Sequence, residues 1–207
     1  MTMNETKTKL ALDDFTRGYI EAMLWSSTCA PFGECAECGA DAVLCWHPET
    51  GEYETCRACT LSSVQVAGDE SKLDNPPGDP SADENYGPKD LAPETLARIV
   101  ADCERFQSEN RLSLGVYEPA RETGEWTGAE LAGHDFWLTR TGHGTGFWDR
   151  FYARSTALVD LDRDKPEERK QAILARVGDK LSARCRWRTA YPELNLYVGD
   201  DGRLYLT

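Results

Sequence analysis

The sequence predicts an α+β fold, in which helices pack on a small antiparallel sheet and a zinc-ribbon-like four-cysteine module is inserted near the N-terminus. Three observations predict this class. Three segments carry apolar residues at helical spacing, short strand-like segments flank glycine-rich turns, and two CxxC pairs lie between the first two helices. A chain of 207 residues, 40% of them hydrophobic, is long enough for one such domain with a small additional module.

Three helices are predicted from start signals and apolar periodicity. The first begins at Asp13 or Asp14, whose carboxylate can cap it, and runs to about Ser27. The second and third begin at Pro93 and Pro166, because proline suits the first turn of a helix. Their apolar faces consist of Leu96, Ile99, Val100, Cys103 and Phe106 in the second helix, and of Ile173, Leu174, Val177, Leu181 and Cys185 in the third.

Two β-hairpins are predicted in the C-terminal half. In residues 133–150, aromatic residues alternate with polar ones and are then interrupted by glycines, which is typical of a hairpin. A second hairpin joins residues 194–198 to residues 203–206 through the turn Gly-Asp-Asp-Gly. The predicted organisation is a first helix of the main domain (1–28), the zinc-ribbon-like module (29–62), an acidic linker rich in Pro and Gly without regular structure (63–90), and the remainder of the main domain (91–207).

The most specific chemical signal is a pair of CxxC motifs, Cys35 with Cys38 and Cys56 with Cys59, separated by seventeen residues. Four thiolates arranged as a tetrahedron select zinc, and a closed four-ligand set leaves no position for a reactive water. We therefore expect one structural zinc ion. A redox dithiol or an iron–sulfur centre could use the same spacing, but the strand-to-helix context of a thioredoxin motif is missing. The alternative ligands nearby are Cys29, Cys45 and His47.

The net charge of −13 is concentrated in one half of the chain. Residues 1–104 hold 20 acidic and 7 basic side chains, whereas residues 105–207 hold 16 of each. The acidity argues against a protein that wraps nucleic acid with clustered Lys and Arg, and it makes phosphate contact by the four-cysteine module itself unfavourable. A protein partner is therefore favoured for that module, and nucleic acid is the less favoured partner.

The first ten residues contain no apolar stretch of the kind found in a secretory signal, and no apolar run approaches the length of a membrane span. We therefore expect a cytoplasmic protein without a membrane partner. In a reducing compartment its eight cysteines are better interpreted as metal ligands or buried thiols than as disulfides.

Residues 133–150 concentrate side chains that could carry function, and three interpretations remain open. As an active site, a hydrolase or nuclease would use His134 or His143 with Asp135 or Asp149 for acid–base chemistry. As a binding site, aromatic rings beside arginines would stack on the bases of a single-stranded nucleic acid. As structure, the aromatic residues form core and the charged residues pair with neighbours. The candidate binding residues are His134, Asp135, Trp137, Arg140, His143, Trp148, Asp149 and Arg150.

Five segments of the chain form a distinctive set. They are residues 14–19 (DFTRGY), 24–27 (LWSS), 90–94 (DLAPE), 133–150 with the pattern GHDFWLTRxGHGxGFWDR, and 196–202 (LYVGDDG). Together these segments resemble an uncharacterised family of small proteins encoded by tailed bacteriophages and prophages. The resemblance implies a phage protein that works inside an infected bacterium, and it implies no catalytic residues. The sequence departs from the family pattern by carrying the CxxC motifs and acidic linker between the first two helices, so the shared task would belong to the remaining domain.

These observations favour a non-enzymatic accessory or inhibitory protein that binds a host or phage macromolecule. One mechanism is mimicry, in which carboxylates at phosphate-like spacing occupy a basic groove. No G-x-S-x-G, phosphate-loop or H-E-x-x-H motif occurs in the chain, so catalysis has the weakest support.

Overall fold

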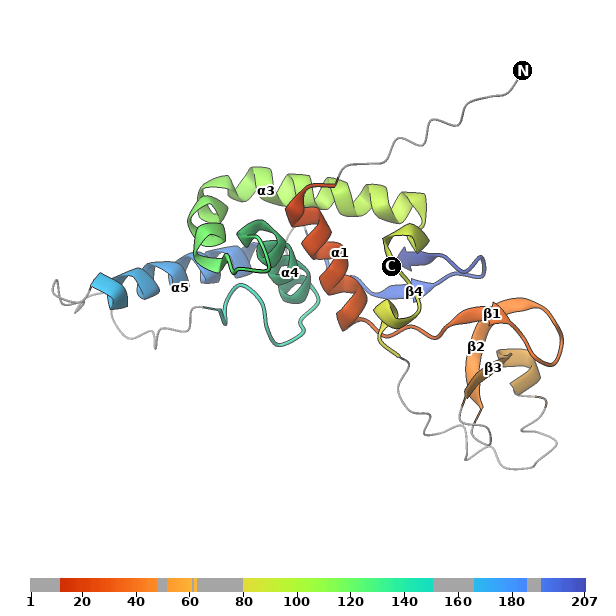
Figure 1. Cartoon of the computed structure of the whole chain (residues 1–207). Coiled ribbons are helices and arrows are strands. Elements are labelled where there is room, and N and C mark those ends of the chain that lie inside the picture. The colour runs from red at the N-terminus through yellow and green to blue at the C-terminus, as the bar shows by residue number, and fades with distance from the viewer. Residues whose placement is uncertain (1–11, 48–51, 61, 63–79, 151–165, 186–190) are drawn as a thin grey trace, which may run out of the picture.

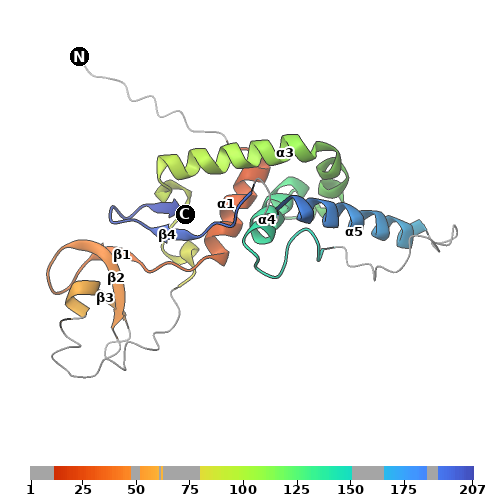
Figure 2. The same cartoon turned by 180° about the vertical axis from the view of Figure 1, so that it is seen from behind.

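The structure, a computed structural model, describes residues 12–47, 52–60, 62, 80–150, 166–185 and 191–207. A helical body and a small four-cysteine module (residues 29–62) lie at opposite ends of the molecule (Figure 1), and the view from behind gives the same arrangement (Figure 2). The predicted α+β class and the inserted zinc-ribbon-like module are confirmed. Much of the predicted acidic linker, residues 63–79, lies outside the described residues.

Helices α1 (Asp14–Ser26) and α4 (Gly128–Arg140) form the most extensive contact of the body. The predicted cap is confirmed, because the Asp13 carboxylate accepts a hydrogen bond of 2.7 Å from the Thr16 backbone N–H. Glycines allow the two helices to approach closely. A Cβ at Gly18 would lie 2.0 Å from the Glu130 carbonyl oxygen, and one at Gly133 would lie 2.0 Å from the Phe15 carbonyl oxygen. Neither position can hold a larger residue unless the helices separate.

The hairpin predicted for residues 133–150 is wrong, because its first half belongs to helix α4. The helix begins with a capping box, in which the Thr127 hydroxyl accepts from the Glu130 N–H and the Glu130 carboxylate accepts from the Thr127 N–H. Almost every side of α4 is buried, so it lacks the polar stripe that marks an amphipathic helix. The alternation of aromatic and polar residues was therefore misleading as a sign of a β-strand.

Helices α3 (Pro93–Arg121) and α5 (Pro166–Cys185) begin at the prolines that predicted them. Helix α3 is kinked at Asn110, whose backbone leaves the helical region (φ −117°, ψ 15°). The predicted core face of α5 is right for Leu174, Leu181 and Cys185 but wrong for Ile173, which is 47% exposed. Helix α5 packs against the second half of α3, and its free N-terminal end projects from the body (Figure 1).

Five aromatic rings pack against one another in the centre of the helical body. Phe106 of α3 and Phe136 of α4 stack with their centroids 4.1 Å apart. Phe15, Phe147 and Tyr191 pack around this pair, with centroids 5.3 to 6.0 Å from one or both rings. All five rings are almost fully buried, so the core is built chiefly by helix packing on helix.

The sheets are small and antiparallel. Strands β4 (Leu196–Val198) and β5 (Leu204–Leu206) form the predicted C-terminal hairpin, which contacts the segment before α3 through a bridge between Leu91 and Leu204. The four-cysteine module contains the three-stranded sheet β1 (Phe32–Glu34), β2 (Asp41–His47) and β3 (Glu52–Cys56). The expectation of no regular structure is wrong for the described end of the linker, which contains the short 3₁₀ helices η2 (Ala82–Glu84) and η3 (Pro88–Asp90).

The two ends of the inserted segment lie side by side. The Cys29 N–H donates to the Pro80 carbonyl at 3.0 Å, and the Ala82 N–H donates to the Ser27 carbonyl at 2.8 Å. The chain therefore leaves the body and returns to it through one antiparallel pairing. Such closely spaced ends are typical of an insertion that the rest of the fold does not require.

Candidate metal centre and the histidine motif

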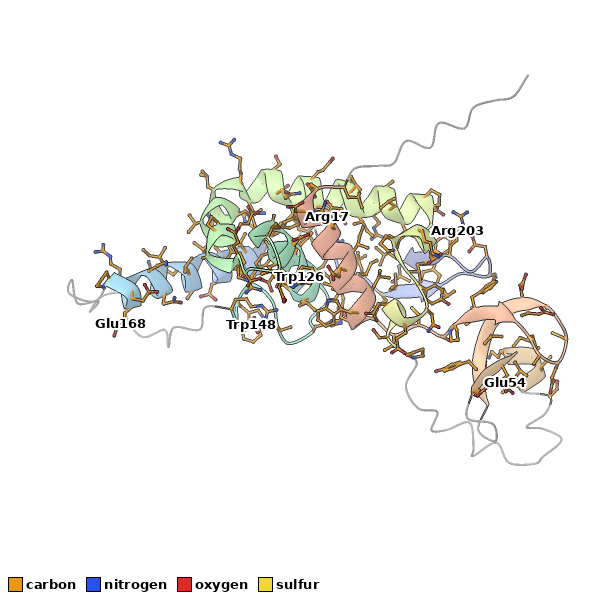
Figure 3. All side chains as sticks on the ribbon, viewed as in Figure 1. Arg17, Glu54, Trp126, Trp148, Glu168 and Arg203 are labelled. Atoms are coloured by element: carbon orange, nitrogen blue, oxygen red, sulfur yellow. The ribbon has the colours of Figure 1, made fainter. Side chains whose placement is uncertain are left out.

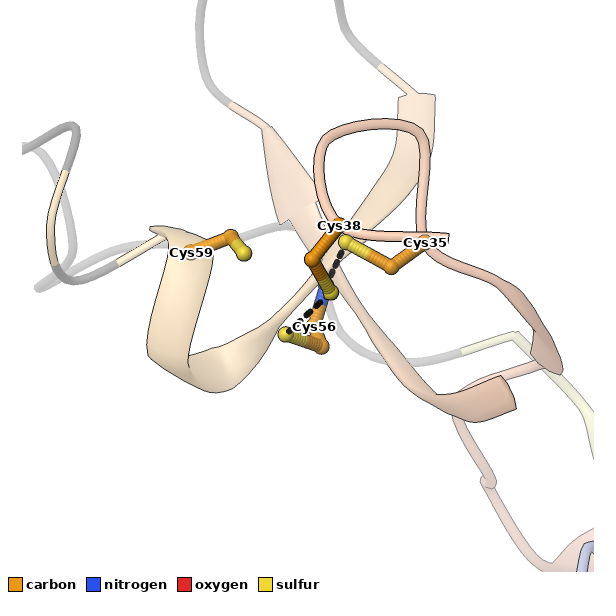
Figure 4. Close-up of side chains that lie close together, drawn as sticks. All are labelled: Cys35, Cys38, Cys56 and Cys59. Carbon is orange, nitrogen blue, oxygen red and sulfur yellow. Dashed lines mark hydrogen bonds between the residues drawn. The ribbon is translucent and has the colours of Figure 1, made fainter. Parts of the chain in front are cut away.

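The first cysteine pair is held in a tight turn between strands β1 and β2 (Figure 4). The Cys35 N–H donates to the Ala40 carbonyl and the Gly39 N–H donates to the Cys35 carbonyl, both at 2.9 Å. Gly39 has a φ of +70°, a conformation that glycine adopts without the cost a side chain would add. The turn thereby directs the thiols of Cys35 and Cys38 to the same side.

The second pair lies where strand β3 ends and a helical turn (57–60) begins. Cys56 is the last residue of the strand and Cys59 lies one turn later, so both thiols face the first pair (Figure 4). The turn is fixed from inside, because the buried Thr60 hydroxyl donates to the Cys56 carbonyl at 3.0 Å and lies 2.7 Å from the Thr55 hydroxyl.

The four thiols form a group that can hold a metal ion, because their sulfur atoms all lie within 4.8 Å of one another. Cys38 Sγ and Cys56 Sγ are 3.9 Å apart. Tetrahedral zinc with Zn–S bonds of about 2.3 Å would place sulfur atoms about 3.8 Å apart, so this separation fits a metal tetrahedron. The group is the predicted one. Of the alternative ligands, Cys29 and Cys45 lie outside it, and the His47 side chain is not among those described.

The backbone also favours the charged form of one ligand. Cys35 Sγ accepts a hydrogen bond of 3.2 Å from the Cys56 N–H. This contact, with further N–H groups of Cys38 and Glu37, lowers the pKa of the Cys35 thiol to about 6. A thiolate is the form that binds a metal, so the turn is preorganised for coordination.

Asp135 of the histidine motif (residues 133–150) is a buried structural carboxylate. Its side chain has no exposed surface and accepts from Arg150 Nε at 2.7 Å, Arg121 Nε at 3.0 Å and the Tyr117 hydroxyl at 2.9 Å. Tyr117 and Arg121 were not predicted as partners of Asp135, although their spacing of four places both on one face of α3. The two guanidinium groups and the phenol saturate the carboxylate.

Arg140 and Trp137 are also part of the core, at 3% and 1% exposure. Arg140 pairs with Asp102 at 2.8 Å, donates to the Pro192 carbonyl at 2.7 Å and lies over the rings of Phe136 and Tyr191. The Trp137 indole N–H donates to the Ser26 hydroxyl at 2.8 Å. A base could stack on Trp137 only if α4 left the body. These contacts favour the structural interpretation for Asp135, Trp137 and Arg140. Their binding role stays a prediction, and their burial leaves little surface for a ligand.

His134 lies at the contact between α1 and α4. Its Nε2 is 3.5 Å from Glu21 Oε2, and no hydrogen bond is formed by this buried nitrogen among the described residues. The ring packs edge-to-face on Trp126, with centroids 5.3 Å apart. Burial lowers the pKa of His134 below 6.5 and outweighs the opposite effect of the Glu21 carboxylate.

His143 lies apart from His134, in the loop after α4. Its Nδ1 is 3.1 Å from the Thr141 hydroxyl and its Nε2 is 3.0 Å from the Ser26 carbonyl, so both ring nitrogens have partners. With Trp137 and Leu194 it borders a hollow of about 230 Å³. The contacts of His143 connect the loop to the end of α1.

The remaining motif residues form a compact turn. Asp149 accepts from the Thr145 hydroxyl at 2.6 Å and from the Gly146 N–H at 3.0 Å. Trp148 is 44% exposed and is directed outward (Figure 3), whereas Arg150 turns inward to Asp135. In the described part of the chain, no hydrogen bond joins either histidine to Asp135 or Asp149. The acid–base pairs of the hydrolase hypothesis are therefore not assembled.

Comparison of the chain with protein-family models, curated proteins and solved structures found no match. Within the described residues, no helix combines the length and apolarity that crossing a membrane requires. The four-cysteine group is the candidate site that the distances between side chains support most directly.

Proposed function

We propose that the chain is a non-enzymatic binding protein, encoded by a phage, whose zinc-loaded four-cysteine module contacts a basic surface of a host or phage protein in the cytoplasm of an infected bacterium. The phage setting rests on the sequence resemblance. Cys35, Cys38, Cys56 and Cys59 would hold one zinc ion. Because four thiolates fill its coordination shell, the ion would stabilise the module without supplying a reactive water.

The observation that carries the proposal is a pair of like charges beside the metal site. Glu34 of β1 and Asp41 of β2 are register partners directly opposite each other, and both are exposed. Like charges in this position destabilise a sheet. The exposed Glu37 lies in the turn between them, and the only exposed cation in the described part of the module is Arg57. A basic partner would relieve this repulsion and gain contacts with three carboxylates.

The geometry of the rest of the molecule agrees with a binding role. The charged residues of the histidine motif that could have served catalysis are engaged in internal contacts. The four-cysteine module projects from the body, with Glu54 at the end remote from α5 (Figure 3). A partner could therefore approach the acidic side of the module without contacting the helical core. Mimicry of nucleic-acid phosphates is the mechanism that this charge pattern suggests.

The proposal is tested by affinity capture from a lysate of infected bacteria, followed by mass spectrometry. The test variant carries Glu34→Gln, Glu37→Gln and Asp41→Asn. The control carries Glu122→Gln, Glu125→Gln and Glu167→Gln, which removes the same charge from exposed positions on the body. Both variants must retain the metal content of the natural chain.

We expect a basic protein to be retained by the natural chain and by the control at about 50 mM salt, and to be released as screening increases toward about 500 mM. The test variant, with its three substitutions in the four-cysteine module, should no longer retain this basic protein. Equal capture by all three proteins, or retention that does not respond to salt, would contradict the proposal.

A further inference from the structure

Helix α5 carries a row of cations on the side that faces away from the core. Arg169, Arg176, Lys180 and Arg184 are all exposed, and their spacings of seven, four and four residues place them on one helix face. Successive residues are about 100° apart, so the four lie within about 80° of one another. The opposite face contains the buried Leu174, Leu181 and Cys185, together with Gly178. The row spans about 22 Å along the helix axis.

The carboxylates of α5 do not interrupt this row. By the same geometry Asp179 lies about 60° around the helix from Arg176 and Glu168 about 100° from Arg169, both on the same side of the row, and Glu167 lies on the core side. Among the residues that the structure describes, no carboxylate lies within ion-pair distance of any of the four cations. Elsewhere on the body such pairs are common, as between Arg105 and Glu109 at 2.9 Å. Ion pairs of the described residues therefore do not neutralise the row, although Arg105 and, more weakly, the nearby Arg184 lower the pKa of the Glu109 carboxyl of α3.

We propose that this basic face of α5 binds the phosphate backbone of duplex DNA. A duplex carries one negative charge per about 1.7 Å of its axis with both strands counted, so about 22 Å of DNA contains about 13 phosphates, of which the row needs to contact only four. The B-form major groove also admits an α-helix, whereas that of duplex RNA is too narrow. Ile173, which is 47% exposed within the row, adds an apolar contact of the kind that suits a groove wall.

The same face fits other polyanions less well. A single-stranded nucleic acid is normally held by aromatic stacking, and the row contains no aromatic residue. A membrane surface requires the apolar side of a helix, which α5 buries in the core. The acidic residues of the four-cysteine module do not prevent contact, because the module lies at the other end of the molecule (Figures 1 and 2) and charges beyond about 10 Å are screened at about 0.1 M salt.

The probe is a fluorescent 20-base-pair DNA duplex, titrated with the full chain at increasing salt. Four phosphate contacts predict a slope of log K against log salt near −3.6, so affinity should fall about 150-fold between about 50 and 200 mM salt. The variant Arg176→Gln with Lys180→Gln should halve the slope, so the same change in salt should weaken it only about 12-fold. It should also bind more weakly at about 50 mM salt.

The matched control is Arg57→Gln with Lys89→Gln, which removes the same charge outside α5. It should bind like the natural chain. Circular dichroism checks that both variants retain their helices. The proposal is overturned if the duplex does not bind at about 50 mM salt, or if the control loses as much affinity as the α5 variant. It is also overturned if a single strand of equal length or a poly-glutamate peptide competes as well as the duplex.

Discussion

Arg150 Nε donates a hydrogen bond of 2.7 Å to Oδ1 of Asp135, which connects the loop after α4 to a carboxylate with no exposed surface. Arg121 binds the other oxygen from α3. Asp135 therefore connects three segments, and its charge is neutralised within the body rather than directed toward a ligand. The same relationship gives the aspartate and the arginine of the histidine motif a structural role.

Replacing this carboxylate should destabilise the body strongly. Asp135→Ala leaves two partly buried guanidinium groups and the Tyr117 hydroxyl without their shared acceptor. Breaking a buried ion pair in this way costs about 3–5 kcal/mol, measurable by urea denaturation. The exposed Glu125→Ala should change stability by less than about 0.5 kcal/mol. A small loss for Asp135→Ala would show that this carboxylate does not hold the three segments together.

Two glycine substitutions should change the stability of the folded chain in opposite directions. Gly133→Ala places a Cβ 2.0 Å from the Phe15 carbonyl and forces α1 and α4 apart, which should cost about 1–3 kcal/mol. Gly115→Ala lies in α3 with nothing within 4 Å of the new atom, and should stabilise the chain by about 0.5–1 kcal/mol. Thermal unfolding of both variants checks the signs. If both substitutions changed the unfolding temperature equally, the close approach of α1 and α4 at Gly133 would not be required for stability.

His134 should make the stability of the body depend on pH. Its pKa is lowered in the folded chain because burial disfavours the charged ring, so the unfolded chain binds the proton first as pH falls through about 6.5. The stability associated with neutral His134 is therefore present above pH 6.5 and decreases below it, toward the lower pKa of the folded state.

The measurement is the free energy of unfolding at about pH 7.5, 6.5 and 5.5 for the natural chain and His134→Gln. The natural chain should lose more stability across this range than the variant. The variant lacks the imidazole of His134, and the two proteins share every other titratable group. Identical pH profiles would refute the assignment.

The body should fold without the inserted four-cysteine module. Because the Cys29 and Pro80 backbones are hydrogen-bonded at 3.0 Å, residues 30–79 can be replaced by Asn-Gly, which favours a two-residue hairpin turn. The shortened chain should retain the circular dichroism signal of its helices and unfold cooperatively. A body that fails to fold without the module would show that the two parts are interdependent.

The sequence predicted those features that depend on local chemistry. Asp13, Pro93 and Pro166 marked helix starts because caps and proline act within one turn. The four-cysteine group was predicted because two CxxC motifs restrict the thiols whatever surrounds them. Each of these signals acts locally, so the packing of the rest of the chain does not change the structure that it predicts.

Helix α4 could not be recognised from periodicity because both its polar and its apolar residues are buried. Asp135 and Arg140 occupy core positions through partners from α3 and the segment before β4, which the sequence does not place nearby. The capping box of Thr127 and Glu130 was the available signal for a helix. The basic face of α5 was also missed, although the spacing of its cations is visible in the sequence.

X-ray absorption at the zinc edge on the purified full chain shows whether the four cysteines hold one structural zinc ion. We expect about one zinc per chain, surrounded by four sulfur atoms at about 2.3 Å, with Cys59→Ser reducing the bound metal and Cys103→Ser leaving it unchanged. A chain without zinc, or with zinc bound to nitrogen or oxygen ligands, would refute the assignment of the four cysteines as the metal ligands.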